Sequence, residues 1–347
     1  MGEWNGMDVA FTLASDPRDE HTAIREAAGV WDTSALTKIH VRGRDALAAV
    51  DYLVTRDMSK VHVGKAGYSP VLKCDGHFCD DGYFFRIAED EVLAATSIGP
   101  SFEYLREWSR GKNLSVELDD DLHVITVQGP KSIDILDTET PVALRELRFC
   151  HHLQTTLFGI RVMLSRTGYS GERGYEIWVR ADDTVALWDR LIDHGKPQGL
   201  TPISWAGLEK VHIESALMAY GAEATEENTP WEVDFGWAVS RTKGDFRGRE
   251  ALFALEGKER VKLRGIIAEC AGEVEHGAEL TLDGERIGHV TTPAYSERLG
   301  QSLALVHVAP SAAQPGTAIR VSGPTVRCAA TVAPIPFVDP ERKRLRA

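Results

Sequence analysis

The pattern of the chain changes at about Glu259, and this change constrains the fold more than any other feature of the sequence. Beyond it, short apolar runs such as "VKLRGIIAE", "ERIGHVTTPA", "SLALVHV" and "AIRVSG" are separated by glycine, proline and aspartate turns. Short strands repeated at this spacing are typical of a β-sandwich or barrel. The pattern therefore predicts an all-β terminal domain that closes into a small barrel.

The residues before Glu259 mix helices with strands. Helices are predicted from about Asp19 to Ala28 and in "DTVALWDRLIDHG", which ends at Gly195. "GYSPVLKCDGHFCDDGYFFRI" predicts a hairpin that turns at Asp75-Gly76. Two further helices, "GRDALAAVDYLVT" and "AGLEKVHIESALMAYG", each present one apolar face. The faces consist of Ala46, Ala49, Val50 and Leu53 in the first, and Ile213, Ala216, Leu217 and Tyr220 in the second.

Composition limits the classes of partner. A chain of 347 residues suggests two or three domains, and its net charge of −13 argues against polyanionic partners such as nucleic acids or membrane surfaces. The first residues contain no long apolar run, so we expect neither a signal peptide nor a membrane span. Five scattered cysteines and the adjacent His151 and His152 lack metal-ligand spacing. We therefore expect reduced thiols, no metal and a cytoplasmic location.

The segment "SRTGYSGERGYEIWV", residues 165–179, places a carboxylate among aromatic side chains. Strand alternation puts Glu176, Trp178 and Arg180 on one face and Tyr175 on the other. One interpretation is a half-exposed strand with Glu176 in water. The other is a fixed carboxylate that accepts two parallel hydrogen bonds from a flat heterocycle such as a pterin or guanine ring.

A second carboxylate lies in "HFCDDGYFFRI". Alternation predicts that Cys79, Asp81, Tyr83 and Phe85 share one face of the strand, so Asp81 has apolar and aromatic neighbours. An acid in such surroundings is a candidate for altered ionisation. The alternative is that Asp80 and Asp81 follow the hairpin turn in solvent.

Several motifs in order resemble the glycine-cleavage T-protein (aminomethyltransferase) family. They are "GYSPVLKCDGHFCDDG", "VQGPKS", "SRTGYSGERGYEI", "ESALMAYG", "GDFRGREAL" and "ERIGHVTTPAYSERLGQSLALVHV", and the likeness runs from about His21 to Val338. The resemblance implies an α+β, three-domain cloverleaf with tetrahydrofolate in its central cavity. It further implies a folate-binding region at 1–257, with subdomains at about 1–50 plus 140–257 and at 51–139, and a β-barrel domain at 258–347.

The resemblance also assigns site residues. Glu176 matches the glutamate that binds the pterin edge, while Tyr169 and Tyr68 match tyrosines of the folate pocket. Asp81 matches the aspartate near the folate nitrogens where the carbon is exchanged. The family arginine that contacts the anionic folate tail is Leu208 here, and Glu209 follows. Substitutes for it are expected in "SRTKGDFRGREAL", which contains Arg241, Lys243, Arg247 and Arg249.

The departures from the family pattern favour its demethylase branch. "HIES" at 212–215 and "ENTPWEV" at 227–233 resemble tetrahydrofolate-dependent demethylases, whose products are a demethylated donor and 5-methyltetrahydrofolate. We therefore expect an enzyme that moves a methyl group from a free small molecule to N5 of tetrahydrofolate without a carrier protein. An aryl methyl ether would need a general acid, for which His151, His152, His212 and Tyr220 are candidates.

The sequence leaves two classes of methyl donor open. Aromatic methyl ethers are slightly preferred, and the alternative is a sulfonium or methylamine compound, which could be held in a cage of aromatic side chains formed by Tyr220, Trp231, Phe235 and Trp237. Two alternatives are the aminomethyltransferase reaction of glycine cleavage and a non-catalytic folate-binding protein. The "KGCYxGQ" motif of the latter is absent from the sequence. Oligomeric state does not follow from the sequence.

Overall fold

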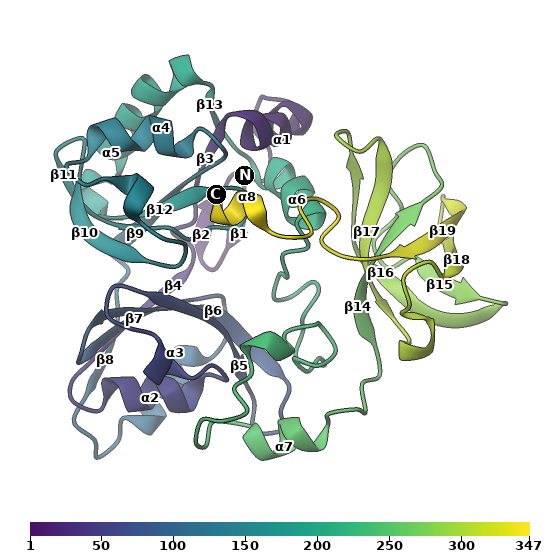
Figure 1. Ribbon diagram of the computed structural model, residues 1–347, viewed down its shortest axis with the longest axis horizontal. Helices are drawn as coiled ribbons and strands as arrows, with labels where there is room; N and C mark the ends of the chain where they lie inside the picture. The colour runs from purple at the N-terminus through teal and green to yellow at the C-terminus, as the bar shows by residue number, and fades with distance from the viewer.

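The computed structural model describes residues 1–347 and consists of three lobes around a common centre (Figure 1). The first lobe is built on a six-stranded sheet that is antiparallel except for the pair β3–β13. Its strands, in spatial order, are β10 (His152–Leu157), β11 (Ile160–Ser165), β12 (Gly174–Arg180), β9 (Leu122–Gln128), β3 (Ala28–Asp32) and β13 (Leu200–Pro202). The helices of this part of the chain are α1 (Pro17–Glu26), α4 (Ser132–Leu136), α5 (Ala181–Gly195) and α6 (Trp205–Glu214), and a short hairpin joins β1 (Gly2–Trp4) to β2 (Met7–Val9).

The second lobe is a five-stranded antiparallel sheet with two helices. Its order is β5 (Ala66–Leu72), β6 (Phe78–Ala88), β7 (Glu91–Thr96), β4 (Thr37–Arg42) and β8 (Ser115–Leu118), and α2 (Ala46–Leu53) and α3 (Ser101–Trp108) belong to it. The chain passes between the two sheets at residues 33–36 and 119–121. From the sequence, the boundaries between the two subdomains were expected at about residues 50 and 139.

The third lobe is a closed six-stranded barrel. Its strands, in order, are β14 (Lys262–Ala268), β17 (Gln301–Val308), β16 (Glu285–Ser296), β15 (Glu279–Leu282), β18 (Ala318–Ser322) and β19 (Arg327–Ala333). Helix α7 (Arg249–Ala254) lies on the path to the barrel, and α8 (Lys343–Arg346) returns the chain to the centre of the molecule (Figure 1). The predicted fold class, α+β with a terminal barrel, is confirmed.

Local patterns predicted several elements well. The four apolar residues assigned to one face of α2 are all buried. The hairpin between β5 and β6 turns at Gly76, whose φ is +86°. A Cβ atom here would lie 2.6 Å from the backbone nitrogen of Leu252 on α7, so both conformation and space require glycine.

The predicted helix through Tyr220 is wrong in its second half. Helix α6 ends at Glu214, and Ala216 adopts a left-handed φ of +45°. Just beyond the helix, the Ser215 hydroxyl donates to the Ser170 carbonyl at 2.9 Å and accepts from Arg25 at 3.1 Å. These tertiary contacts hold the chain at the point where the apolar spacing alone would continue the helix.

A β-bulge changes the predicted face of β6. The register with β5 shifts between Val71 and Leu72, so Cys79 faces the apolar cluster around α2 while Asp81 faces Tyr68. Asp80 turns toward α3, where Ser101 donates to its carboxylate at 2.5 Å. Because one extra residue reverses the alternation, the expectation that Cys79 and Asp81 share a face is wrong.

A buried ionic cluster joins α1, α6, the 165–179 segment and the barrel. Arg25 donates to Glu214 at 2.9 Å and to Glu172 at 3.0 Å, and Ser296 of β16 donates to Glu214 at 2.6 Å. Burial alone would raise the pKa of Glu214, but His21 and Arg25 together lower it to about 2. The carboxylate is therefore ionised in the folded protein at neutral pH.

We predict that Glu214→Gln lowers the free energy of unfolding by roughly 3–5 kcal/mol, because Arg25 is left buried without its main counter-charge. The depressed pKa means that this contribution is complete above about pH 4.5 and is lost as the pH falls toward 2. Urea unfolding of the unaltered protein and the Glu214→Gln variant between pH 3 and 7 measures the difference in unfolding free energy. Equal stability at pH 7 would contradict the assignment.

Candidate functional site

Most of the predicted site residues meet where the lobes face one another. Asp81 lies on β6 of the second lobe and Glu176 on β12 of the first, and both side chains are almost fully buried. Tyr68 on β5 donates a hydrogen bond to Asp81. Burial raises the pKa of Tyr83, two residues beyond Asp81, and the nearby Cys150 and Glu176 raise it further. The two predicted carboxylates therefore belong to one aromatic-lined site.

Asp81 is a buried acid that titrates near neutral pH. Burial raises its pKa to about 7, although the hydrogen bond from Tyr68 opposes the shift and the neighbouring Asp80 adds to it. Tyr68 lies edge-on to Tyr83, with ring centroids 5.3 Å apart, and 6.3 Å from the nearly parallel indole of Trp237. A carboxyl group with such a pKa exchanges protons readily at physiological pH.

Glu176 is held by hydroxyl groups, and no basic side chain pairs with it. Thr167 donates to its Oε2 atom at 2.5 Å and Ser165 at 3.5 Å, whereas Oε1 has no hydrogen bond within the protein. Burial raises the pKa of Glu176, and the two hydroxyl donors partly offset the effect. The predicted alternation is confirmed, because Trp178 lies on the same face and donates to Ser165 at 3.0 Å. The free oxygen suits a ligand with N–H donors.

Tyr169 and His212 form a second wall of the site. Their rings lie 5.6 Å apart, and the Tyr169 hydroxyl donates to the Leu217 carbonyl at 3.3 Å. Burial lowers the pKa of His212 to about 4, and its Nε2 atom has no hydrogen-bond partner. His212 is therefore neutral at pH 7. Leu208 belongs to the apolar cluster against which Tyr169 packs, so this replaced family position borders the site.

Three acidic side chains lie around Tyr169, and burial raises the pKa of each of them. Burial also raises the pKa of Tyr169 well above the usual value, and the charges of Glu223, Asp81 and Glu209 raise it further. Glu223 is fully buried and accepts hydrogen bonds from the Thr292 hydroxyl and, at 2.9 Å, from the Ala219 amide. Glu209 has no ion-pair partner within 4.0 Å. We call Asp81, Glu209 and Glu223 the acidic wall.

Tyr220 lies near the acidic wall rather than on a helix. It forms an isolated bridge with Ala224 and packs on the apolar cluster that contains Phe78 and Met218. Burial raises its pKa, and the charges of nearby acids, Asp81 among them, raise it further. A phenol with a raised pKa is a weak proton donor, as is neutral His212.

The two arginines predicted to bind the folate tail lie elsewhere, by α7. Arg241 pairs with Glu256 at 3.1 Å and lies 5.4 Å from the Trp231 ring, and Arg249 lies 5.0 Å from the Phe253 ring. Two further basic residues lie in the same segment. Lys243 donates to backbone carbonyls of residues 51–56, and the Arg247 guanidinium carbon lies 3.5 Å from the centroid of the Tyr104 ring. This basic segment binds its own chain.

Arg56 is the cation that the sequence reasoning missed. It donates to the Tyr68 carbonyl at 2.6 Å, lies 5.3 Å from the Trp237 ring and is near Tyr83 and Cys150. No motif singles it out, since it follows α2 in an ordinary "VTRD" stretch. Only the packing of the lobes brings it to the site.

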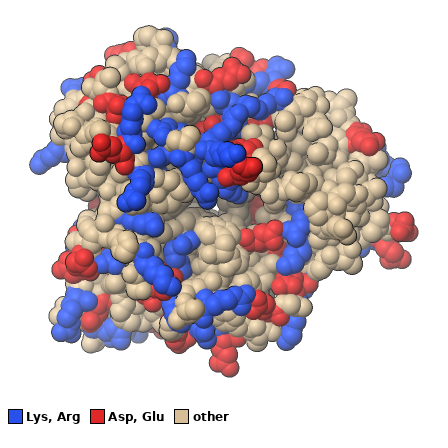
Figure 2. Space-filling model, viewed as in Figure 1, with Lys and Arg blue, Asp and Glu red and all other residues tan.

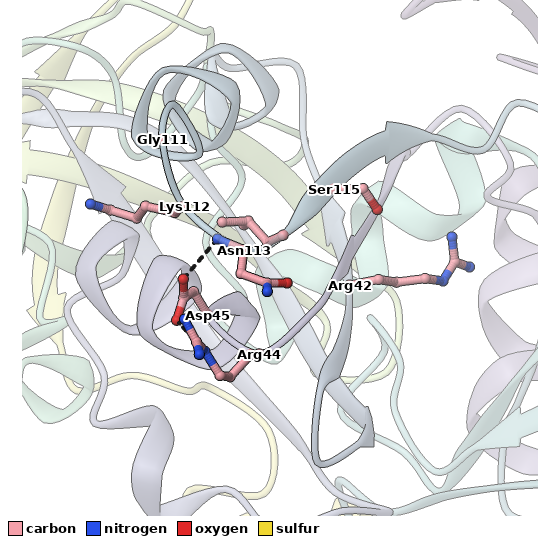
Figure 3. Close-up of a pocket in the computed structure, with 8 residues that line it drawn as sticks. Arg42, Arg44, Asp45, Gly111, Lys112, Asn113 and Ser115 are labelled. Carbon is pink, nitrogen blue, oxygen red and sulfur yellow. Dashed lines mark hydrogen bonds and ion pairs between the residues drawn. The ribbon is translucent and has the colours of Figure 1, made fainter.

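A surface groove of about 630 Å³ lies outside this site (Figure 3). It lies at the edge of the second lobe, and its lining includes Arg42, Arg44 and Lys112. Asp45 in the groove accepts from the Asn113 amide at 2.8 Å, and Arg42 pairs with Glu91 at 2.8 Å. Its polar groups are therefore largely satisfied within the chain.

Two family models match the chain, the GCVT N-terminal domain over residues 3–243 and the glycine cleavage T-protein C-terminal barrel domain over residues 261–339. The chain belongs to the glycine cleavage T-protein family. Similar curated proteins include the gamma subunit of a heme-dependent oxidative N-demethylase from Ectopseudomonas mendocina, 38% identical over all of this chain and 94% of that protein. An aminomethyltransferase of Streptomyces avermitilis is 34% identical over 92% of this chain and 88% of that protein.

The fold agrees with a solved structure of the family. Aminomethyltransferase T of the glycine cleavage system from Bartonella henselae superposes with a TM-score of 0.90 at 24% identity, covering 98% of this chain and 94% of that one. The expected family, fold and enzyme class are thus confirmed, and the protein is a one-carbon transferase. None of its helices has the length and apolar character needed to cross a bilayer.

We predict that the Asp81 carboxyl titrates near pH 7 and that Tyr68→Phe raises its pKa further, because the phenol stabilises the ionised form. Carbon-13 NMR of aspartate-labelled protein between pH 4 and 9 measures both values. Asp81→Asn identifies the resonance by removing it. A pKa near 4 in the unaltered protein would show that the carboxyl is well solvated.

Proposed function

We propose that this enzyme transfers the carbon of an N-methyl group to tetrahydrofolate bound between the lobes. The observation that carries the proposal is the pair of buried carboxylates, Glu176 with a free oxygen and Asp81 with a pKa of about 7. The first suits the N–H edge of a pterin and the second suits proton transfer beside it. Tetrahydrofolate supplies the nitrogen nucleophiles that accept the carbon.

Glu176 orients the pterin in this proposal. Its carboxylate accepts the adjacent N–H donors, and Thr167 and Ser165 keep it in place from the other side. Ionised acceptors form the strongest hydrogen bonds, and a bidentate pair also fixes the plane of the ring. His212, whose Nε2 atom lacks a partner, offers a further polar contact on the opposite wall.

Asp81 takes up the proton that a folate nitrogen loses when its bond to carbon forms. A base is most effective when its pKa lies near the working pH, and burial has moved this carboxyl there. Tyr68 holds the carboxylate in one orientation. The ionised form also stabilises positive charge at the reacting nitrogen.

The walls of the site favour a cationic donor. Glu209 and Glu223 lie near Tyr169, and the nearby rings of Tyr68, Phe235 and Trp237 attract cations through their faces. An aromatic methyl ether, which the sequence slightly preferred, needs an acid to protonate its leaving phenolate. Neither neutral His212 nor Tyr220 serves this purpose well. We therefore place a methylated amine ahead of the ether.

The E. mendocina relative, a subunit of an oxidative N-demethylase, supports formaldehyde as the oxidation level of the transferred carbon. Oxidation of an N-methyl group yields an iminium cation, which water converts to amine and formaldehyde. Formaldehyde plus tetrahydrofolate gives 5,10-methylenetetrahydrofolate and one water. On this proposal, oxidising partner subunits produce the formaldehyde, and this chain condenses it with tetrahydrofolate through an N5 iminium cation that the acidic wall stabilises.

A second candidate is transfer of an intact methyl group to N5, giving 5-methyltetrahydrofolate. The acidic wall and its aromatic neighbours favour it equally for a sulfonium or quaternary ammonium donor, both of which carry good leaving groups. Glycine cleavage itself would instead require an aminomethyl carrier protein. The three reactions differ in donor and product, so one assay separates them.

We predict that the purified enzyme speeds conversion of tetrahydrofolate and labelled formaldehyde to the methylene product above the uncatalysed rate. Asp81→Asn should remove most of this acceleration, by about 100-fold in kcat, because the base is lost. Mass spectrometry distinguishes methylene from methyl products, and the surface variant Asp134→Asn is the control. Methyl transfer from an onium compound would favour the second candidate, and activity only with a carrier protein would favour glycine cleavage.

We also predict that Glu176→Ala weakens tetrahydrofolate binding by about 2–4 kcal/mol, because the pterin donors lose a buried ionised acceptor. Calorimetry gives the dissociation constants. The Glu176→Gln variant keeps the shape of the side chain, so its affinity for tetrahydrofolate should lie between those of the unaltered protein and the alanine variant. Unchanged affinity in the alanine variant would rule out the proposed orientation of the pterin.

A further inference from the structure

Two of the five cysteines lie opposite each other at one end of the barrel. Strands β14 and β19 are antiparallel, and Ala268, the last residue of β14, pairs with Ala330. The Glu269 amide still donates to a carbonyl of β19 at 2.8 Å, so the pairing continues past the end of the strand. Two residues beyond Ala268, the same register brings Cys270 opposite Cys328.

This register suits a disulfide bond. Residues 269 and 329 share a backbone hydrogen bond, so the cysteines next to them occupy a non-hydrogen-bonded position of the ladder. Opposite Cα atoms at such a position are about 4.5 Å apart, which lies within the range that disulfides span. Cys328 belongs to the apolar cluster inside the barrel, and Cys270 packs against that cluster. Both thiols therefore face the same side of the two strands.

The two thiols are free and differ in exposure. Cys270 is half-buried, and its Sγ atom donates to the Gly272 carbonyl at 3.1 Å. Cys328 is buried, and burial together with the neighbouring Cys270 raises its pKa to about 11. Because the thiolate is the form of cysteine that reacts, an oxidant dissolved in water attacks Cys270 first. The buried Cys328 thiol then lies beside it to complete the bond.

The β14–β15 loop, residues 269–278, connects this end of the barrel with α6. Its Glu273 accepts from the Lys210 ammonium group at 3.3 Å and from the Tyr295 amide of β16 at 3.1 Å. Lys210 lies on α6, the helix that brings His212 to the site. Charged side chains of both signs lie along the boundary between the first lobe and the barrel (Figure 2). A change at the first residues of the loop is therefore close to a contact with a wall of the site.

We propose that Cys270 and Cys328 are a redox switch, whose disulfide fixes the start of the β14–β15 loop and stabilises its contact with α6. The oxidant is a hydroperoxide such as hydrogen peroxide. The Cys270 thiolate attacks one peroxide oxygen, the O–O bond breaks, and a sulfenic acid and hydroxide form. The Cys328 thiol then displaces the sulfenic oxygen, which leaves as water with the thiol proton. Two thiols thus lose two electrons and two protons, and one peroxide becomes two waters.

A peptide map of the full-length protein tests the disulfide. We expect hydrogen peroxide to link the peptides of Cys270 and Cys328, dithiothreitol to reverse the link, and Cys270→Ser and Cys328→Ser each to prevent it. Oxidation should raise the melting temperature by about 5 °C, because a cross-link restricts the unfolded chain. The control Cys74→Ser removes an exposed thiol and should keep both effects. Because Cys270 is partly exposed, its variant tests the link even if Cys328→Ser does not fold.

Hydrogen exchange followed by mass spectrometry tests the link to α6. Oxidation of the unaltered protein should slow exchange of the α6 amides by about 3-fold or more, because the fixed loop holds Lys210 through Glu273. Glu273→Ala should still form the disulfide but lose this effect. Unchanged exchange in the oxidised protein, or an effect that persists in Glu273→Ala, would overturn the switch. Absence of a link between Cys270 and Cys328 after peroxide treatment would overturn the site itself.

Discussion

The buried pairing of Arg25 with Glu214 is the interaction on which the rest of the structure depends. The Arg25 guanidinium group donates to Glu214 at the end of α6, and to Glu172 and the Ser170 carbonyl in the 165–179 segment. Glu214 in turn accepts a hydrogen bond from Ser296 of the barrel. Burying these charges carries a large desolvation penalty, which only a fully hydrogen-bonded arrangement offsets. The cluster therefore tolerates one relative position of the first lobe and the barrel, and the site lies beside it.

The site that results is electrically polarised. The acidic wall lies around Tyr169, whereas Arg56 and Glu176 lie near Tyr83 and Cys150. Among buried side chains such opposed charges interact more strongly than in water. On the proposed function, a reacting centre that becomes cationic is stabilised beside the acidic wall, and holding it there is the kind of positioning that accelerates group transfer.

The periodic spacing of apolar residues along the sequence predicted many of the helices and strands correctly. Alternation correctly put Glu176 and Trp178 on one face of β12, and helical spacing identified the buried face of α2. The same rules failed where the backbone departs from a regular element. The bulge at Cys79 reverses the face of β6, and the left-handed Ala216 ends α6 early. In both places tertiary contacts outweigh local preference, which a periodic pattern does not register.

The sequence by itself determined the class of fold and the family, and it singled out the two carboxylates of the candidate site, because each depends on residue type and spacing along a continuous stretch. Tertiary structure alone decided their surroundings. Arg56, Tyr83 and Cys150 lie on separate stretches of the sequence and meet only when the first and second lobes pack together. The pKa of Asp81 likewise comes from burial between lobes. The exclusion of solvent and the interactions between charges on distant segments depend on the whole fold, so no local stretch of sequence predicts them.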